Sequence, residues 1–327
     1  MTREPPITVL YCIDNAYLPQ AGVALSALLD AAPEARFEVV VAAFGLDIGL
    51  SEAVFGAVMQ GRDHAALRFV AVDEGLFEGL PVTRDFSRSI YTRLVLQRFI
   101  APETERVLYL DADTIVQGDI GALWRADLGG ATLGVVRDHF RLDLERIGFA
   151  PGKPYFNSGV LLIDMARWRQ RACETRVLEL LARRGRDLPW MDQDALNIAL
   201  GDEARFLDLD WNWQPRCADV PADFLGLDAQ RYEAMRASPR LVHYTTSFKP
   251  WNAAHRVHYS ALFFAAAAAS GIPADLLPAR LAARGLAQQA MRVKTLARWH
   301  APGAFRAARR LVRPEAAAAM YRSGPGQ

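Results

Sequence analysis

Short apolar runs, each long enough for one buried strand, alternate with amphipathic stretches along most of the chain. Apolar runs of this length predict strands, whereas apolar residues spaced three and four positions apart predict helices. Their alternation indicates an α/β protein with a mainly parallel twisted sheet and helices on both faces. The predicted strands cover residues 7–13, 37–44, 67–72, 131–136 and 240–242, with others ending before Asp111 and beginning after Asn157; the predicted helices cover 19–29, 89–99, 195–200 and 261–269, with another capped by Ser51.

Polar residues directly follow two of these predicted strands. Asp14 and Asn15 come after the first strand, and Asp111 and Asp113 come after the strand that begins at Arg106. In parallel α/β sheets, ligands bind beyond the carboxyl ends of the strands. The sequence therefore predicts a binding site at this edge of the sheet.

Asp111 and Asp113 form the most informative pair. Residues two apart in extended backbone point to the same side, so both carboxylates can share one cation. Without a cation between them, adjacent carboxylates repel each other. Mg²⁺ or Mn²⁺ held in this way keeps open positions for phosphate oxygens. The alternative is a solvated turn, in which aspartate is common; His243 would join a metal site only if the fold brought it to the two aspartates.

Three other groups have both a structural and a functional interpretation. Asn157 and Gly159 either form a turn before a strand or let the backbone approach a ligand. Asp192 either caps the helix that follows it or, together with Gln193, binds sugar hydroxyls. Lys249 is either a surface lysine or, beside a diphosphate, a phosphate clamp.

The charge of the chain is unevenly distributed. The whole chain has a net charge of only +1, but residues 277–327 hold ten Lys/Arg and one acid, so they carry +9 and the remainder carries −8. Within this tail, apolar and basic residues have amphipathic helical spacing near residues 286–297 and 305–312. Basic amphipathic helices bind anionic membrane surfaces. We therefore predict a catalytic domain at residues 1–270 and a helical, membrane-associated region at 271–327; a solvated or oligomer-packing helix is the alternative.

The cysteine content and the apolar segments indicate where the protein works. Cys12, Cys173 and Cys217 are widely spaced, which argues against a disulfide framework or a zinc site and suits a reducing compartment. The chain shows neither a signal peptide nor an apolar run long enough for a membrane span. We therefore expect a cytoplasmic protein, peripheral on the inner face of the cytoplasmic membrane.

The order and spacing of the motifs resemble glycosyltransferase family 8, the retaining enzymes that include bacterial lipopolysaccharide glucosyl- and galactosyltransferases. The resemblance covers about residues 7–255 and implies a GT-A fold, a UDP-linked sugar donor, Mn²⁺ (or Mg²⁺) and a glycan or lipid-linked glycan acceptor. The motifs that carry it are Asp14-Asn15, Ser89-Ile90-Tyr91-Thr92-Arg93-Leu94, Leu110-Asp111-Ala112-Asp113, Phe156-Asn157-Ser158-Gly159-Val160, Asp192-Gln193-Asp194, Trp211-Asn212-Trp213 and His243-Tyr244 with Lys249-Pro250-Trp251.

The resemblance also implies roles for single residues. It implies that Asp111, Asp113 and His243 bind the metal, that Lys249 holds the diphosphate, and that Asp14 and Asn15 contact the nucleotide. It also implies that Arg93, Asn157 and Asp192 hold the donor sugar, with Ala112 and Ser158 beside it and Gln193 under the anomeric carbon. Asp138 is implied to contact donor or acceptor sugar. The chain departs from the family at Ile13, where relatives often have an acid, and at Thr246, where they commonly have glycine.

Retention of the anomeric configuration constrains the mechanism. A double displacement needs a carboxylate beneath the sugar, and the amide of Gln193 is a poor nucleophile. Front-face attack, in which the leaving phosphate takes the acceptor's proton, is therefore favoured, with Asp192 as the alternative nucleophile and Arg93 close to the reacting sugar.

Two other classes of protein share some of these features. A non-catalytic sugar-nucleotide-binding or membrane scaffold protein would not need both aspartates and His243. A nucleotidyltransferase also uses a metal on an α/β sheet, but no Gly-rich phosphate loop follows the first strand. No nucleic-acid recognition motif accompanies the basic tail, so no nucleic-acid partner is expected.

Overall fold

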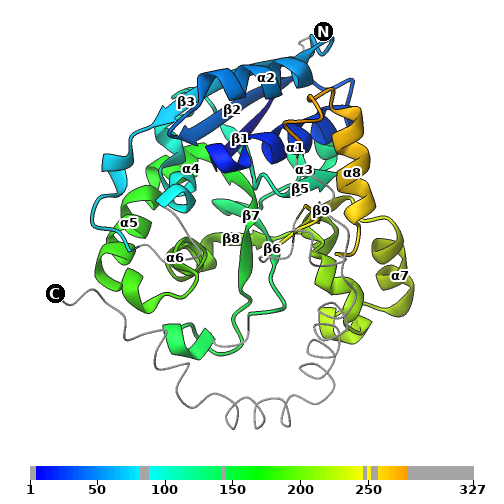
Figure 1. Cartoon of the computed structure of the whole chain (residues 1–327). Coiled ribbons are helices and arrows are strands. Elements are labelled where there is room, and N and C mark those ends of the chain that lie inside the picture. The colour runs from blue at the N-terminus through cyan, green and yellow to red at the C-terminus, as the bar shows by residue number, and fades with distance from the viewer. Residues whose placement is uncertain (1–4, 82–87, 142–143, 246–248, 252–256, 278–327) are drawn as a thin grey trace, which may run out of the picture.

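A computed structural model describes residues 5–81, 88–141, 144–245, 249–251 and 257–277 of the chain. These residues contain a seven-stranded sheet with the order β3-β2-β1-β4-β7-β6-β8, and a separate two-stranded sheet of β5 and β9 (Figure 1). The strands are β1 Ile7–Asp14, β2 Phe37–Phe44, β3 Ala65–Val72, β4 Arg106–Leu110, β5 Thr114–Val116, β6 Leu133–Arg137, β7 Phe156–Asp164, β8 Ala204–Phe206 and β9 Leu241–His243.

The main sheet is mostly parallel, as predicted, but one strand runs the other way. Strands β3, β2, β1 and β4 run parallel to one another, and β8 is parallel to β6. Strand β7 is antiparallel to both β4 and β6. The chain returns from β6 to β7 without a helical crossover to the opposite end of the sheet, so the two strands must be antiparallel.

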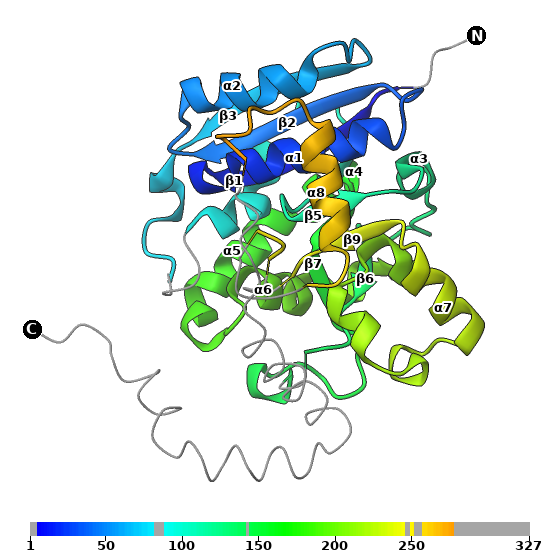
Figure 2. The same ribbon diagram turned by 45° about the vertical axis from the view of Figure 1, so that its right-hand side comes forward.

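Helices cover both faces of the main sheet (Figures 1 and 2). One face carries α1, α2 and α8, and the other carries a 3₁₀ helix at Arg88–Arg98 together with α4, α5 and α6. The α-helices are α1 Leu18–Asp30, α2 Ile48–Met59, α3 Ile120–Trp124, α4 Met165–Gln170, α5 Cys173–Arg184, α6 Met191–Leu200, α7 Ala229–Ala237 and α8 Ser260–Ala269. Shorter 3₁₀ helices are η1 Asn15–Tyr17, η2 Glu74–Phe77, η4 Leu144–Ile147, η5 Gly185–Asp187, η6 Gly201–Glu203, η7 Leu209–Asn212, η8 Pro215–Asp219 and η9 Ala222–Leu225.

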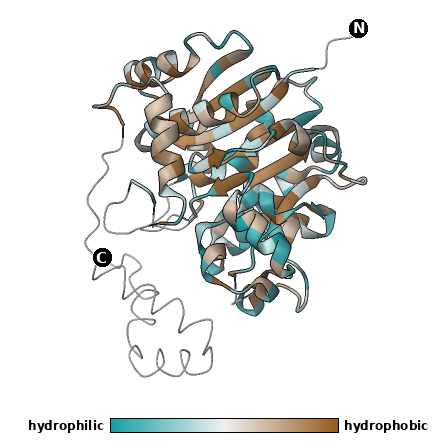
Figure 3. Cartoon of the chain, turned by 90° about the vertical axis from the view of Figure 1, so that its right-hand side faces the viewer, coloured by the Kyte–Doolittle hydropathy of each residue, from teal (hydrophilic) through white to brown (hydrophobic). Residues whose placement is uncertain are grey.

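The central strands are apolar along their whole length because both of their faces are buried. In β1, Val9, Tyr11 and Ile13 pack into one core cluster, whereas Leu10 packs into the cluster on the other side. Figure 3 shows the strands of the sheet largely in the colour of hydrophobic residues. A strand buried on both faces reads as a continuous apolar run, which is why these strands could be predicted from the sequence.

Several predicted helices have different starts or types in the structure. Ser51 was predicted as an N-cap, which is wrong: α2 begins at Ile48, and the side chain of Asp47 caps it by accepting a hydrogen bond from the backbone N–H of Leu50 at 2.9 Å. Aspartate is a strong N-cap, and Asp47 precedes Ser51. The predicted helix at residues 89–99 is a 3₁₀ helix whose backbone breaks at Val95.

The end of the described chain packs onto the helices that cover the main sheet. After α8, which buries only one side, Ile272 lies in the same core cluster as α1 and α2. Among the helices that the structure describes, none has the length and hydropathy of a bilayer-spanning segment. The amphipathic helices predicted beyond residue 277 lie outside the described residues.

Candidate active site

The two sheets together bring distant residues to one point. Asp111 follows β4, and its backbone N–H donates to the carbonyl oxygen of Gly159 in β7 at 2.8 Å. Asp113 immediately precedes β5, in which Thr114 lies opposite His243 of the antiparallel strand β9. Pairing of β5 with β9 therefore carries His243 to the aspartates, which no local sequence pattern could indicate.

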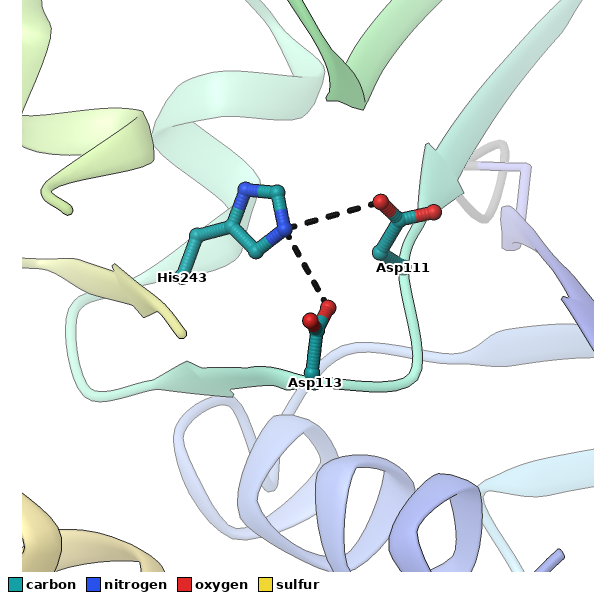
Figure 4. A group of neighbouring side chains, drawn as sticks. All are labelled: Asp111, Asp113 and His243. Carbon is teal, nitrogen blue, oxygen red and sulfur yellow. Dashed lines mark ion pairs between the residues drawn. The ribbon is translucent and has the colours of Figure 1, made fainter. Parts of the chain in front are cut away.

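The three side chains converge on one small space (Figure 4). The Nε2 atom of His243 lies 3.5 Å from Oδ2 of Asp111 and 3.2 Å from Oδ1 of Asp113. One ligand atom from each residue lies within 4.8 Å of the others. Two carboxylate oxygens and one imidazole nitrogen suit Mn²⁺ and leave coordination positions for other oxygens. The donor set therefore fits the divalent metal that the family resemblance implies.

The surroundings of the aspartates favour their charged forms. Burial raises the pKa of Asp113, but Lys249 and His243 outweigh burial and hold this pKa well below its usual range. Burial is likewise the largest influence on Asp111, and Arg93 and His243 overcome it and lower its pKa. Burial lowers the pKa of His243, but Asp113 and Asp111 prevail and raise it to about 9. The site therefore stabilises positive charge beside its carboxylates.

Lys249 is a buried component of this site. Its Nζ atom forms an ion pair with Asp113 and donates a hydrogen bond to the carbonyl oxygen of Tyr244 at 2.6 Å. Burial lowers the pKa of Lys249, but the Asp113 carboxylate raises it overall. The surface-lysine interpretation is therefore wrong, because the ammonium group is enclosed against one of the candidate metal ligands.

Arg93 links the metal-binding group to the start of α6. Its guanidinium lies 3.0 Å from Oδ1 of Asp111 and 3.2 Å from Oδ2 of Asp192, and it donates to the carbonyl oxygen of Ser158 at 3.2 Å. The same group stacks 4.8 Å from the ring centroid of Tyr109. These contacts lock a planar cation between two carboxylates.

Asp192 and Gln193 are buried in the first turn of α6. Because α6 begins at Met191, Asp192 lies inside the helix, and the predicted alternative of an N-cap is wrong. Burial raises the pKa of Asp192 to about 6, although Arg93 opposes this shift. The side-chain oxygen of Gln193 accepts hydrogen bonds from the backbone N–H of Ser158 at 3.0 Å and from Asn157 at 3.1 Å.

The Asp14-Asn15 pair makes different contacts. The side chain of Asn15 donates to the carbonyl oxygen of Gly45 and accepts from the backbone N–H of Asp47 at 2.9 Å, so it ties η1 to the turn before α2. One carboxylate oxygen of Asp14 is buried and has no hydrogen-bond partner within the described residues. Asp14 thus offers an acceptor to a ligand, whereas the amide of Asn15 is occupied by the protein.

Asp138 and Ala112 complete the predicted residues. The carboxylate of Asp138, just after β6, accepts from the backbone N–H of Phe140 at 2.9 Å and lies 3.4 Å from the guanidinium of Arg216. Ala112 is buried in the core cluster that contains α1. Asp138 is therefore a residue of the loop after β6, held by Arg216.

Two side chains that contact the metal-binding cluster, Tyr109 and Asn212, were not among the predicted site residues. The hydroxyl of Tyr109 donates to Asp111 at 2.5 Å, and Asn212 lies 2.9 Å from Nδ1 of His243. Gly159 was predicted to allow close approach of a ligand, but the nearest neighbours of a β-carbon there would be His243 and Asp111. The Trp211-Asn212-Trp213 motif was the available signal for Asn212.

The GT-A arrangement of the sheet and the Asp-Asp-His cluster beyond the carboxyl end of β4 define the class of the protein. The family model for glycosyl transferase family 8 matches residues 8–255, and the chain belongs to this family. It is therefore a glycosyltransferase, as the resemblance of its motifs indicated.

Individual relatives agree with this assignment. A lipopolysaccharide 1,2-glucosyltransferase of Escherichia coli K12 is 26% identical over 75% of this chain and 73% of its own length. A lipopolysaccharide 1,3-galactosyltransferase of Salmonella typhimurium LT2 is 26% identical over 75% of this chain and 72% of its own length. The crystal structure of the galactosyltransferase LgtC, in complex with donor and acceptor sugar analogs, superposes with a TM-score of 0.68 at 27% identity, covering 80% of this chain and 96% of LgtC.

Proposed function

We propose that the protein is a metal-dependent, retaining hexosyltransferase. It transfers glucose or galactose from a UDP-sugar to a glycan acceptor in the synthesis of lipopolysaccharide or another cell-surface polysaccharide. The two named lipopolysaccharide hexosyltransferases and the LgtC complex support this choice of donor and acceptor. The observation that carries the proposal is the meeting of Asp111, Asp113 and His243 beside a fixed Arg93–Asp192 pair.

Charge neutralisation at the leaving diphosphate is the first requirement of this reaction. Asp111, Asp113 and His243 would hold Mn²⁺ (or Mg²⁺), which when bound supplies Lewis-acid stabilisation of the leaving group. Lys249 supports the proposal because its ammonium group already lies against Asp113 inside the site. It adds a point charge close to the diphosphate oxygens and restrains Asp113.

Holding the donor sugar falls to residues around Arg93. The carboxylate of Asp192, oriented by its 3.2 Å contact with Arg93, accepts hydrogen bonds from sugar hydroxyls. Asn157 and Ser158 adjoin the same space through their contacts with Gln193.

Retention follows from front-face attack. The amide oxygen of Gln193 already accepts from the backbone N–H of Ser158, and an amide is a poor nucleophile. In this proposal Gln193 lies beside the anomeric carbon as a dipole that stabilises positive charge. The acceptor hydroxyl attacks on the face from which the diphosphate leaves, and the departing phosphate oxygen takes its proton. In the alternative route, Asp192 is the nucleophile, at the cost of its ion pair with Arg93.

The remaining assignments concern the periphery of the site. The unpartnered oxygen of Asp14 supports a contact with the nucleotide, and Asn15 contributes by fixing the turn beside it. Ala112 contributes backbone next to the donor. Asp138 lies on a loop suited to the acceptor, and Arg216 holds its carboxylate in one orientation.

Membrane association belongs to the same proposal. The body at residues 1–270 catalyses transfer, and the region at 271–327 binds the anionic inner face of the cytoplasmic membrane. The net charge of +9 on residues 277–327 supports this division. A lipid-linked glycan acceptor would be found at that surface.

A donor screen tests the proposed function. Purified protein with Mn²⁺ is incubated with UDP-, GDP- and ADP-linked hexoses, and release of the nucleoside diphosphate is measured. We expect hydrolysis of a UDP-hexose by the wild type and none by Asp113→Asn. Turnover of only GDP- or ADP-sugars would contradict the UDP assignment.

A further inference from the structure

A chain of buried side-chain amides connects His243 with Gln193. Oδ1 of Asn212 lies 2.9 Å from Nδ1 of His243, and Nδ2 of Asn212 donates to Oδ1 of Asn157 at 2.9 Å. Nδ2 of Asn157 in turn donates to Oε1 of Gln193 at 3.1 Å. All four side chains are buried, with Asn212 fully enclosed at 0% exposure. The chain therefore runs from the candidate metal site to the candidate reaction centre without passing through solvent.

Backbone donors fix the direction of every hydrogen bond in this chain. The N–H of Ser158 donates to Oε1 of Gln193 at 3.0 Å, and the N–H of Gly159 donates to Oδ1 of Asn157 at 3.0 Å. A backbone N–H can only donate, so both side-chain atoms that it meets must be oxygens. The Nδ2 atoms of Asn157 and Asn212 then have to donate along the chain, and Oδ1 of Asn212 has to accept from His243.

The direction of these side-chain hydrogen bonds determines which atoms of His243 and Gln193 are left for other contacts. Because Nδ1 of His243 donates to Asn212, its Nε2 atom is the one directed at Asp111 and Asp113, as a metal ligand requires. At the other end, Nε2 of Gln193 is left to donate to the hydroxyl of Tyr155 at 3.3 Å. The amide of Asn212 fixes the orientation of His243, but it reaches Gln193 only through Asn157, and Gln193 is also held by the backbone N–H of Ser158.

The side chain of Asn212 does not hold its own segment in place. The backbone of the following residue, Trp213, pairs with β9: its N–H donates to Leu241 at 2.9 Å, and its carbonyl oxygen accepts from the N–H of His243 at 3.0 Å. Substitution of the Asn212 side chain therefore leaves the main-chain bonds of this segment intact. The amide of Asn212 therefore acts on the side chains that it contacts.

We propose that Asn212 is a positioning residue that sets the metal-binding imidazole of His243 directly and supports the amide of Gln193 through Asn157. The part that concerns Gln193 rests on the proposed function, whereas the part that concerns His243 does not. Hydrogen bonds to the second nitrogen of a metal-bound histidine typically change metal affinity by about 10- to 100-fold. Asn212 thus links the strength of metal binding with the geometry at the anomeric carbon.

Two substitutions separate the two ends of the chain. Asn212→Leu has a similar shape but makes no hydrogen bond, so it releases His243 and removes the hydrogen bond that supports Asn157 beside Gln193. Asn212→Asp keeps an oxygen that accepts from His243 but places its other oxygen against Oδ1 of Asn157, so it disrupts only the half that leads to Gln193. Asn157→Asp provides a second disruption of that half, because its new oxygen would face Oε1 of Gln193.

The first measurement is the Mn²⁺ dissociation constant of the full-length, donor-free protein by electron paramagnetic resonance. We expect about 10-fold or greater weakening in Asn212→Leu, and wild-type or tighter binding in Asn212→Asp and Asn157→Asp. Asn197→Asp is the matched control, since Asn197 is a buried amide that bonds to the backbone of Phe156 and Gln193 and to none of the side chains that link His243 with Gln193. Wild-type Mn²⁺ affinity in Asn212→Leu would overturn the proposal, as would equal weakening in Asn212→Asp. Thermal unfolding checks that each variant is folded. If Asn212→Leu is too unstable for the Mn²⁺ titration, the ¹⁵N chemical shifts of the His243 ring report its tautomer instead.

The second measurement is transfer at saturating Mn²⁺, which removes differences in metal affinity. We expect kcat to fall about 10-fold or more in Asn212→Asp and Asn157→Asp, with a smaller change in the KM of the donor. Wild-type kcat in Asn212→Asp would refute the link to Gln193. If the wild type itself transfers no sugar while the Mn²⁺ pattern holds, the proposed function fails and the role toward His243 stands.

Discussion

Gly159 and His243 are packed so closely that a β-carbon on Gly159 would lie 2.1 Å from Cε1 of His243. The same β-carbon would lie 2.6 Å from Oδ2 of Asp111. Both distances are below any real non-bonded contact, so His243 and Asp111 can approach each other only over a glycine. The metal-binding cluster therefore requires a residue without a side chain at position 159 of β7.

This packing predicts the effect of Gly159→Ala. The added methyl group should push His243 and Asp111 apart and weaken Mn²⁺ binding by about 10-fold or more, at a cost in stability of about 1–3 kcal/mol from overpacking. Titration with Mn²⁺ and thermal unfolding measure the two effects. Gly201→Ala is the control, because a β-carbon at Gly201 has no neighbour within 4 Å. Equal Mn²⁺ affinity in the two variants would show that the cluster can adjust around the methyl group.

The raised pKa of Asp192 predicts an acidic limb in the pH profile. Burial raises this pKa to about 6, with Arg93 opposing, so Asp192 becomes protonated as the pH falls through about 6. The protonated carboxyl no longer pairs with Arg93 or accepts as a carboxylate from the sugar, so kcat/KM should decrease below pH 6 at saturating Mn²⁺. The sign for stability is the opposite: because folding raises the pKa of an acid, Asp192 stabilises the fold at low pH and loses that contribution as the pH rises through about 6.

Comparison with Asp192→Asn tests this assignment. The variant should have a lower kcat/KM, by about 10-fold or more, and should lack the limb near pH 6. A limb of the same midpoint in the variant would mean that another group titrates there.

Front-face attack at the donor sugar predicts retention. With an α-linked UDP-hexose, the first-formed glycoside should be the α anomer, because the acceptor enters on the face that the diphosphate leaves. Proton NMR of the product at early times distinguishes the anomers before any mutarotation of hydrolysed sugar matters. A β product would require a general base, and Asp192 and Asp138 would be the first residues to test in that role.

The basic tail predicts salt-dependent membrane binding. Each Lys or Arg near an anionic surface contributes about 1 kcal/mol, and salt screens this attraction. The full chain should therefore sediment with anionic vesicles at low salt and be released as salt rises. A shortened chain ending at Leu277 keeps Ile272 in the core and should still hydrolyse donor while binding vesicles far less. Equal or salt-insensitive vesicle binding by both chains would remove the membrane role.

The sequence predicts well those parts of the molecule that depend on local pattern. Residues 37–44 were predicted as a strand and coincide with β2, since a short apolar run rich in β-branched valine favours a buried strand. Asp111 and Asp113 were expected to face the same side of extended backbone, whereas in the structure they lie in the turn between β4 and β5, and this turn brings them together. Their meeting with His243 was available only through family resemblance, because it depends on β5 pairing with β9.

Other features depend on tertiary contacts that leave little trace in the sequence. The direction of β7 is set by its neighbours β4 and β6, and not by its own residues. The contacts of the Asn15 side chain with the turn at Gly45 and Asp47 join residues about thirty positions apart, and no sequence pattern indicates them. Asn212 was visible as part of a motif, but its contact with His243 appears only when η7 packs beside β9.

Metal dependence is the central claim of this account, and donor turnover in the presence and absence of chelator tests it most directly. Wild-type protein treated with EDTA should show no release of UDP from a UDP-hexose, and excess Mn²⁺ should restore release. Asp111→Ala should stay inactive at every Mn²⁺ concentration, with a loss of about 100-fold or more, because the leaving diphosphate lacks its counter-charge. Full activity of the wild type in EDTA, or of Asp111→Ala in Mn²⁺, would contradict the account.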